Sequence, residues 1–397
     1  MDHVSRDVSS NAFGHPDAAP ERPDPDLRAL TRVSLDTLLA IMGSADGLLC
    51  FTMVPHGNGI RQLGVSPRYT AIALIGLLTA KTNGHGFDID PSRVVSVLLE
   101  SVANGANIGD LGLVSWVAAL AGDREVCDNR LKPIVQERLQ ETRCGCTSME
   151  VQWLLTGLCK LYQQFPGSGW LEPLIRRCYE NLTPFYNDKT GLFCDIYPCK
   201  LVNRWKKDLS YFCNQTYGIY SLCTYYETFG DRQALQWALG TARKICSLQG
   251  ELGQWPWLFD SRKGTVVSVY PVYSVHQDAM APMALRKLSD LSGEDFTANI
   301  LRGVSWVLGK NELGESMVDS GRGVIWRSIR KRTPLHHGHA FKLIKLIHVT
   351  HLDSIRNLAD PFLSYEVDRE CRPYELGWLL YAFSGRLEDR NPSRTSG

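Results

Sequence analysis

Apolar positions along the chain follow the period of an α-helix nearly throughout. They recur every three or four residues, which places them on one face of a helix. This pattern predicts helices over residues 27–42, 66–81, 92–103, 107–121, 128–141, 148–164, 170–186, 209–229, 231–248, 274–291, 295–309 and 372–385. Residues 338–349 form a weaker candidate. We therefore expect an all-α protein.

Turn-forming residues indicate where these helices begin and end. Asp90-Pro91 is a start signal, because proline is favoured at the first helical position. Residues 188–191 and 260–264 have the composition of turns between short strands, so β-hairpins are expected in some loops. Helix ends are predicted at four glycines that follow apolar runs: Gly43, Gly122, Gly230 and Gly293.

The number of helices suggests how they are arranged. About twelve helices form six hairpins, and no TPR, HEAT or ankyrin repeat is visible. We predict an (α/α)6 barrel, a toroid of six inner and six outer helices with short β-hairpins in the inter-helix loops. An open α-solenoid is the alternative. Residues 27–388 are expected to form this single domain, between a disordered tail at 1–26 and a flexible tail at 389–397.

Composition and charge narrow the classes of function. Apolar residues make up 44% of the chain, charged residues 21%, and the net charge is +1, as in a soluble globular protein without a strong field. No apolar run is long enough to span a membrane. The first residues lack the apolar core of a secretory signal. We expect a cytoplasmic location and no nucleic-acid partner.

The cysteine and histidine patterns do not predict a metal site. Cys144 and Cys146 are too close for the CxxC spacing of zinc and redox sites. His348 and His351 share a helix face with His336–His339 nearby, but no cysteine or carboxylate falls at ligand spacing. We expect no metal and no cofactor. Buried, reduced thiols are expected where cysteines fall in apolar helical patterns: Cys159, Cys178, Cys223 and Cys246.

Residues 250–283 carry the densest candidate chemistry. Ser274 and Gln277 fit a capping box, which would begin a helix and place His276 and Asp278 in its first turns. A helix N-terminus favours negative charge, so Asp278 is predicted to stay ionised and to act as a base or nucleophile. His276 would titrate near neutrality as its proton partner. Pro282 is expected to kink this helix. The alternative is that the side chains of His276 and Asp278 only form local hydrogen bonds.

The same stretch supplies further candidates. Tyr273 is a second possible proton partner, and Glu251 or Asp260 is a candidate general acid if it packs against an indole. Trp255 and Trp257 flank a proline and are held stiffly. We expect one of these rings to be core and the other to line a cleft as a stacking wall for a sugar.

Other candidate binding residues lie elsewhere in the chain. An arginine at a helix start is not placed for the helix dipole, so an anion-binding role competes with a surface ion pair. Amides beside aromatic rings often bind hydroxyl-rich ligands, although buried amides bonded to the backbone are as common. The candidates are Arg68, Tyr69, Asn214, Gln215, Tyr270, Trp326 and Glu375, the last in the first turn of the final helix.

Absent motifs exclude several classes. The chain has no GxGxxG after a strand, no GxxxxGK[ST], no HExxH and no GxSxG, which argues against nucleotide binding, zinc-protease and serine-hydrolase chemistry. The GQWPW loop, the helix count and the aromatic-acid loop before an inner helix resemble the six-hairpin (α/α) toroid enzymes, which include glycoside hydrolases, uronyl hydrolases, polysaccharide lyases and sugar epimerases.

The resemblance implies a carbohydrate-active enzyme that hydrolyses, eliminates or epimerises a glycoside or uronate by acid–base catalysis. Its partner would be a small-molecule or oligosaccharide substrate, in carbohydrate metabolism or polysaccharide biosynthesis. A toroid related to terpene or prenyl cyclases is one alternative, although the DxDD acid motif of cyclases is absent. A non-catalytic toroid that binds a glycan or a partner is the other alternative.

Overall fold

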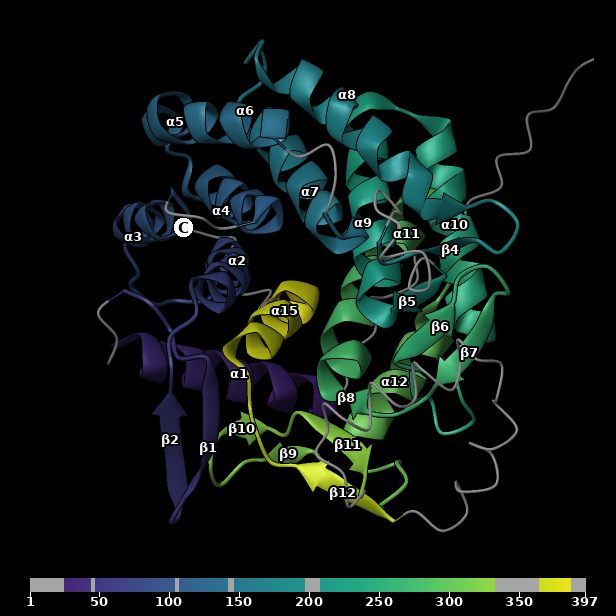
Figure 1. The fold of residues 1–397 in the computed structure, drawn as a ribbon. Coiled ribbons are helices and arrows are strands. Elements are labelled where there is room, and N and C mark those ends of the chain that lie inside the picture. Colours follow the sequence, from purple (N-terminus) through teal and green to yellow (C-terminus); the bar gives the residue numbers. More distant parts are fainter. Residues whose placement is uncertain are drawn as a thin grey trace, which may run out of the picture.

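A computed structural model describes residues 25–43, 47–103, 107–141, 146–196, 208–332 and 364–386 (Figure 1). Its helices are α1 (Pro25–Gly43), α2 (Pro67–Thr82), α3 (Pro91–Ala103), α4 (Ile108–Ala121), α5 (Arg124–Val126), α6 (Lys132–Glu141), α7 (Ser148–Gln164), α8 (Leu171–Leu182), α9 (Phe212–Phe229), α10 (Arg232–Ser247), α11 (Ala281–Ser292), α12 (Thr297–Val307) and α15 (Pro373–Phe383). Wide π turns form η1 (Cys127–Leu131) and η4 (His276–Met280), and 3₁₀ turns form η2 (Thr183–Phe185) and η6 (Ser384–Arg386).

The helices form two concentric layers. The inner layer consists of α2, α4, α7, α9, α11 and α15, and each is preceded in the chain by an outer helix. Contacts run from each inner helix to the next, and α15 packs against α2, so the ring closes (Figure 1). The fold is therefore an (α/α)6 toroid, as predicted, and the open solenoid is wrong.

Burial explains which helices lie inside. Consecutive residues 70–78 of α2 are buried, so this helix is surrounded by protein on all sides and its sequence is apolar all round. An outer helix such as α8 buries one stripe, at the spacing of a helix face. Its buried residues are Leu171, Ile175, Cys178 and Leu182.

Glycines allow neighbouring inner helices to approach closely. A Cβ atom at Gly76 of α2 would overlap with the backbone of Gly377 in α15, and one at Gly157 of α7 would overlap with the backbone of Gly112 in α4. Because any larger residue would force these helices apart, the glycines set the tight packing of the inner ring.

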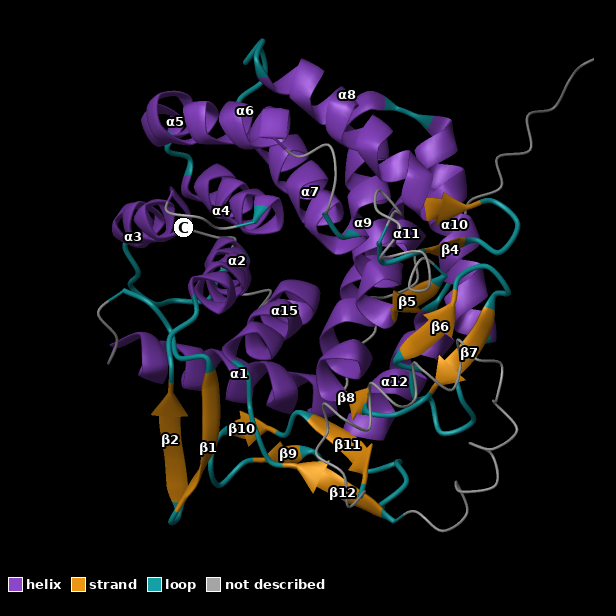
Figure 2. Cartoon of the chain, in the orientation of Figure 1, coloured by secondary structure: helices purple, strands orange, loops and turns teal. Residues whose placement is uncertain are grey.

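Short antiparallel strands fill the loops between helices (Figure 2). The strands are β1 (Thr52–His56), β2 (Gly59–Leu63), β3 (Tyr186–Asn187), β4 (Leu192–Phe193), β5 (Leu209–Tyr211), β6 (Leu258–Asp260), β7 (Thr265–Ser268), β8 (Val272–Tyr273), β9 (Val318–Asp319), β10 (Val324–Ile325), β11 (Ser328–Lys331) and β12 (Tyr365–Asp368). β11 pairs with both β8 and β12. Since β8 precedes η4 and β12 precedes α15, this sheet fixes the starts of two inner helices.

The predicted helices agree with the observed ones to within a few residues. Gly122, Gly230 and Gly293 have left-handed backbone angles at helix C-termini, as predicted. One difference is at residues 209–211, which form β5 instead of the first turn of α9. The candidate helix 338–349 and most of both predicted tails lie outside the described residues, although α1 already begins at Pro25.

Candidate active site

The first turns of the inner helices gather at one end of the barrel, because these helices run in the same direction. Arg68 of α2, Asn214 of α9, Asp278 of η4 and Glu375 of α15 all lie in first turns. Helix N-termini carry partial positive charge and unpaired amide groups. This end of the barrel is therefore where several predicted residues come together.

The helix that carries Asp278 begins differently from the prediction. The Ser274 amide donates to the carbonyl of Arg327 at 2.9 Å. Gln277 accepts a hydrogen bond from the Trp255 amide at 3.1 Å and donates to the carbonyl of Tyr273 at 3.1 Å. The predicted capping box is wrong, because the Ser274 hydroxyl donates to the carbonyl of Trp326 at 2.6 Å and the Gln277 oxygen accepts from Trp255.

A wide π turn replaces the predicted kink at Pro282. In η4 the amide of Ala281 bonds to the carbonyl of His276, five residues earlier. Pro282 lies in the first turn of α11 and has no amide to offer the carbonyl of Asp278. Isolated π turns are rare and occur often at functional sites.

Asp278 and Glu375 form a buried pair of carboxyl groups. Asp278 is 0% exposed and Glu375 is 1% exposed. Both carboxyl oxygens of Asp278, and Oε1 of Glu375, have no hydrogen-bond partner within the described residues. Burial of an unpaired carboxylate is costly, so such groups in native proteins call for an explanation.

The environment raises the pKa values of both carboxyl groups. Burial raises the pKa of Asp278 well above its ordinary value. Burial also raises the pKa of Glu375, the charge of Asp278 raises it further, and Arg327 opposes the rise. The helix N-terminus was expected to favour the ionised form of Asp278, but desolvation outweighs the local dipole and the pKa rises instead.

His276 is buried beside the pair. Its ring lies 4.8 Å from that of Phe212 and 5.2 Å from that of Tyr273. Burial lowers the pKa of His276 to about 3, so the prediction of titration near neutrality is wrong. Its Nδ1 atom has no partner within the part of the chain that is described. A neutral imidazole can donate or accept a hydrogen bond but carries no charge.

Half-buried aromatic rings lie beside His276 and extend toward solvent. Tyr273 lies 6.4 Å from Trp257 between ring centroids, and Trp257 lies 5.7 Å from Tyr211. The guanidinium of Arg327 lies 5.3 Å over the ring of Tyr273. Burial raises the pKa of Tyr273, while Arg327 opposes that shift. Tyr273 and Trp257 thus belong to the same surface.

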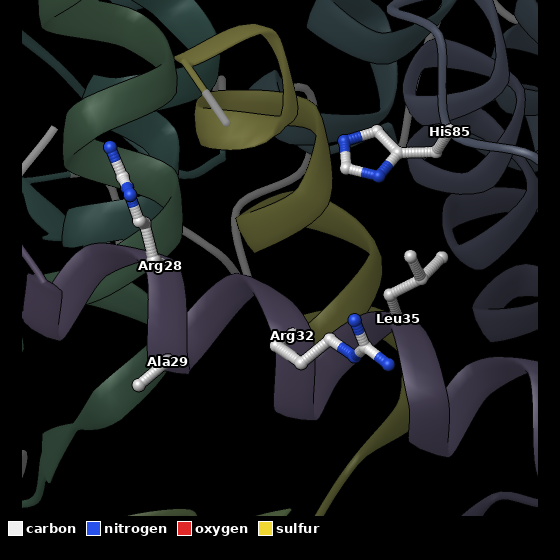
Figure 3. A pocket seen from close by; sticks show the side chains of 5 residues that line it. All are labelled: Arg28, Ala29, Arg32, Leu35 and His85. Atoms are coloured by element: carbon white, nitrogen blue, oxygen red, sulfur yellow. The ribbon is translucent and has the colours of Figure 1, made fainter. Parts of the chain in front are cut away.

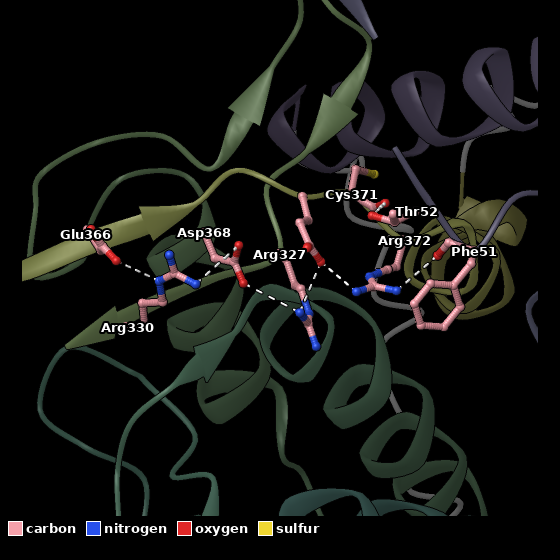
Figure 4. A network of polar contacts seen from close by, with 9 residues as sticks. Phe51, Thr52, Arg327, Arg330, Glu366, Asp368, Cys371 and Arg372 are labelled. Atoms are coloured by element: carbon pink, nitrogen blue, oxygen red, sulfur yellow. Dashed lines mark hydrogen bonds and ion pairs between the residues drawn. The ribbon is translucent and has the colours of Figure 1, made fainter. Parts of the chain in front are cut away.

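A stack of rings lies beside Glu375. Tyr69 lies between Phe51, at 5.3 Å, and Tyr374, at 4.6 Å. The guanidinium of Arg372 lies 4.0 Å from the centre of the Phe51 ring and donates to the Phe51 carbonyl at 3.2 Å (Figure 4). This stack fixes the chain that leads into α15, and Tyr374 immediately precedes Glu375.

Arg68 makes an ion pair at the same end of the barrel. Its Nε and Nη2 atoms donate to both carboxylate oxygens of Asp110, at 2.6 and 3.1 Å. The guanidinium also lies 5.3 Å from the ring of Trp153. The ion-pair alternative therefore describes its contacts, and a role in anion binding stays a prediction.

The two predicted amides hold loops in place. Asn214 donates to Ser148 at 2.9 Å and to Asp195 at 3.1 Å. Gln215 accepts from the Phe193 amide at 2.8 Å and donates to the Phe193 carbonyl at 2.9 Å. Both amides are fully buried, so their contacts match the structural alternative.

Three predicted aromatic residues serve the core or an outer loop. Trp255 is fully buried and stacks on Phe212 at 5.3 Å, so no face is open as a stacking wall. Trp326 is 3% exposed. Tyr270 donates to Glu312 at 2.7 Å. Of the two tryptophans around the proline, Trp255 is the core ring.

The predicted general acids have other surroundings. Glu251 is exposed in the loop after α10. Asp260 is 3% exposed, but its Oδ1 atom accepts from the amides of Arg262 and Lys263, at 3.0 and 2.8 Å. Asp260 thus stabilises the β6–β7 turn, and a role of either residue as general acid stays a prediction.

A cavity of about 450 Å³ lies at the opposite end of the barrel (Figure 3). Arg28, Arg32 and Leu35 of α1 and His85 line it, with Ala29. His85 follows α2 and lies 3.2 Å from the carbonyl of Ser384, which caps α15. Cations are favoured near helix C-termini, so these residues have a structural explanation. The lining offers no carboxylate for acid–base chemistry.

Sequence reasoning missed the residues that surround the pair. The residues not predicted from the sequence are Arg327, Cys371, Arg372 and Tyr374. Their role depends on the pairing of β11 with β8 and β12, which joins distant segments. The one local signal is the Trp326-Arg327 pair directly before a strand.

Two further properties concern only the described residues. None of their helices is both long and apolar enough to cross a membrane. In the same ranges, no three His, Cys, Asp or Glu side chains cluster in a way that could hold a metal ion.

Solved structures share this fold at low sequence identity. No family model and no curated protein matches the chain. An unsaturated glucuronyl hydrolase from Streptococcus agalactiae is 14% identical, with a TM-score of 0.56 over 91% of this chain and 92% of that one. A sugar epimerase from a ruminal bacterium is 10% identical, with a TM-score of 0.60 over 91% and 99%. A glycosyl hydrolase family 88 protein from Bacteroides vulgatus is 10% identical, with a TM-score of 0.56 over 91% and 98%. At these identities the likeness concerns the fold: the chain shares the (α/α)6 toroid of glucuronyl hydrolases and sugar epimerases.

Proposed function

We propose that this protein is a carbohydrate-active enzyme whose acid–base chemistry is performed by Asp278 and Glu375. The observation that carries the proposal is the buried pair itself. The charge of Asp278 raises the pKa of Glu375, and both oxygens of Asp278 and Oε1 of Glu375 have no partner within the described residues. Strongly perturbed carboxyl groups of this kind cluster at functional sites, because catalysis needs proton affinities that an exposed acid lacks.

The unpartnered polar atoms favour a substrate with hydroxyl groups. Acceptor atoms come from Asp278 and Glu375, and donor atoms from Nε of Arg327 and Nε of Arg372. His276 adds an imidazole nitrogen that can do either. A sugar hydroxyl both donates and accepts, so a polyol can satisfy this mixed set. A hydrocarbon would leave every one of these buried groups unpaired, which argues against the cyclase alternative.

The two acids would take different roles. Negative charge on Asp278 raises the pKa of Glu375, so Glu375 holds the remaining proton and is the general acid. Asp278 is the base. In hydrolysis Glu375 would protonate the departing oxygen while Asp278 takes a proton from the attacking water, and the two protons balance. In elimination or epimerisation Asp278 would abstract the proton on the carbon beside a carboxylate or carbonyl group.

The structural neighbours suggest which sugars to test first. A variant of the glucuronyl hydrolase was crystallised with dGlcA-GalNAc6S, an unsaturated uronyl disaccharide. Another neighbour carries the name of sugar epimerase. Uronate-containing and reducing sugars are therefore the first substrate classes to examine, and the other substrates of the fold come after them.

One set of assays separates the three reactions. The purified protein is incubated with an unsaturated uronyl disaccharide, whose ultraviolet absorbance falls on hydrolysis. A uronate-rich polysaccharide gives rising absorbance on elimination. A reducing disaccharide in heavy water gains deuterium on epimerisation. The Asp278→Asn, Glu375→Gln double variant is the blank. Turnover in the double variant equal to that of the natural protein would exclude the pair.

No turnover in any arm by a well-folded protein would favour the non-catalytic alternative. The same probes are then titrated by calorimetry, because a binding toroid would still release heat with a glycan. Turnover in one arm that the double variant lacks would support the enzyme and identify the reaction.

A further inference from the structure

Arg327 is held at the junction between the two segments that lead to the acids. Its amide donates to the carbonyl of Glu370 at 2.7 Å, in the chain that enters α15. Its carbonyl accepts from Ser274 at 2.9 Å, at the start of the helix that carries Asp278. Its backbone therefore connects the helix starts of Asp278 and Glu375.

The side chain of Arg327 is oriented by its neighbours. Nη1 lies 3.1 Å from Glu370 and 3.5 Å from Asp368 (Figure 4). The guanidinium also lies over the ring of Tyr273. Nε has no hydrogen-bond partner within the described ranges. The side chain is 30% exposed, while its Nε atom is buried.

Arg327 is the cation that acts on Glu375. Burial and the charge of Asp278 raise the pKa of Glu375, and Arg327 lowers it. For Asp278 burial dominates, and its own backbone amide is the opposing influence. The titratable groups around the pair, taken from every element packed on it, are Arg327, His276, Tyr273, Tyr69, Tyr374, Cys371, Cys50 and Arg372.

We propose that Arg327 is a positioning residue that joins the two helix starts and holds a positive charge at their junction. This inference rests on the proposed function, because it matters for catalysis only if the pair is the acid–base machinery. Without Arg327, Glu375 would keep its proton to a higher pH and would be a weaker acid. With Arg327, the proton can be released and regained during turnover.

Arg330 is a matched control. It lies three residues further along, on β11, with its side chain 29% exposed. Arg330 forms ion pairs with Glu366 at 2.8 Å and with Asp368 at 3.7 Å. Arg327 likewise pairs with one glutamate and with Asp368. The charge of Arg330 is not among those that act on Glu375. Loss of Arg330 therefore removes a comparable ion pair without removing the proposed effect.

The proton on Glu375 can be followed without a substrate. A protonated carboxyl group in a dry site gives a carbonyl stretching band in the infrared spectrum, and its loss with rising pH reports the titration. Comparison with Glu375→Gln identifies the band. In Arg327→Gln we expect the band to persist to a pH higher by roughly one unit, the lower limit for loss of a nearby opposite charge. Arg330→Gln should titrate like the natural protein.

Arg327→Lys separates charge from packing. Lysine keeps the positive charge but loses the planar fork and its stacking on Tyr273. The lysine variant should therefore restore most of the natural titration, and circular dichroism confirms that each variant is folded. If Arg327→Gln fails to fold, the infrared titrations of Arg327→Lys and Arg327→Met are compared at low temperature. This pair again differs by the positive charge at position 327.

Two results would overturn the inference: equal titration of Arg327→Gln and Arg330→Gln, or a lysine variant that behaves like glutamine. Failure of the proposed function looks different. In that case no sugar probe is turned over, while the infrared shift in Arg327→Gln remains.

Discussion

The two ends of the barrel stabilise their carboxylates in opposite ways. Toward the C-terminal ends of the inner helices, Glu227 of α9 accepts from Lys287 at 2.8 Å and from Gln163 at 3.1 Å. Lys160 lies 3.7 Å from the same carboxylate. At the N-terminal ends, Asp278 and Glu375 are buried, the charge of Asp278 acts on Glu375, and neither has an ion pair among the described residues.

The contacts of Glu227 are reflected in the pKa values of Glu227 and Lys160. Burial would raise the pKa of Glu227, but the hydrogen bond and charge of Lys287, together with Lys160, outweigh it and lower that pKa. Burial and the nearby Lys287 lower the pKa of Lys160 to about 8. One end thus uses charge to hold helices together. The other end tolerates a cost in stability, as expected where buried acids are retained for chemistry.

The largest expected effect tests the N-terminal end. Asp278→Asn and Glu375→Gln keep the shape of each side chain and remove its acid–base function. On the sugar probe that the natural protein turns over, each should lower turnover by about 10²–10⁴-fold. Steady-state rates at one pH provide the measurement, with Glu227→Gln as the control that retains activity. A fully active Asp278→Asn protein would remove Asp278 from the mechanism.

A second substitution tests the packing of the inner helices α4 and α7, which extend between the two ends. Alanine at Gly157 would overlap with the backbone of Gly112 in the neighbouring inner helix. Overpacking of this kind costs about 1–3 kcal/mol, and chemical denaturation should show it as a lower midpoint. Gly169→Ala is the control, because nothing lies within 4 Å of its added carbon. Equal midpoints for the two variants would mean that α4 and α7 can separate freely.

Much of the fold could be predicted because it follows local rules. Apolar periodicity predicted the inner and outer helices. Glycines such as Gly122 and Gly230, which have left-handed backbone angles, predicted where helices end. The close approach of Gly112 and Gly157 could not be predicted, since a glycine inside a helical pattern does not name its partner.

The site was predicted less well, and the reason is physical. Asp278 and His276 were selected from local pattern, but the shifts of their pKa values were not predicted, because burial depends on the whole ring. Glu375 was selected for its helix start, without any indication that it meets Asp278. Arg327 was overlooked because strand pairing, and not sequence spacing, brings it to the helix starts.

The pH dependence of stability should distinguish the two ends. A carboxyl group with a raised pKa stabilises the folded state fully below its unfolded pKa, and this contribution is lost as pH rises through the folded pKa. Asp278 and Glu375 should therefore make the natural protein less stable as the pH rises from the ordinary carboxylate range upward. Asp278→Asn should flatten this decline and unfold at a higher denaturant concentration at neutral pH. Urea titrations at a series of pH values measure it, and a variant with the same decline as the natural protein would contradict the assigned environment.

The smallest expected effect belongs to the C-terminal end and has the opposite sign. The pKa of Glu227 is lowered, so its contribution is present above its unfolded pKa and is lost as the pH falls. Glu227→Gln leaves Lys160 and Lys287 without their shared carboxylate. Because Glu227 is 39% exposed, solvent screens the interaction, and the variant should lose about 1 kcal/mol at neutral pH and less in acid. Denaturation midpoints at both pH values test this, with Lys160→Met as the companion variant. If Glu227→Gln proved more stable than the natural protein, as Asp278→Asn should be, the two ends would not differ in the way their contacts indicate.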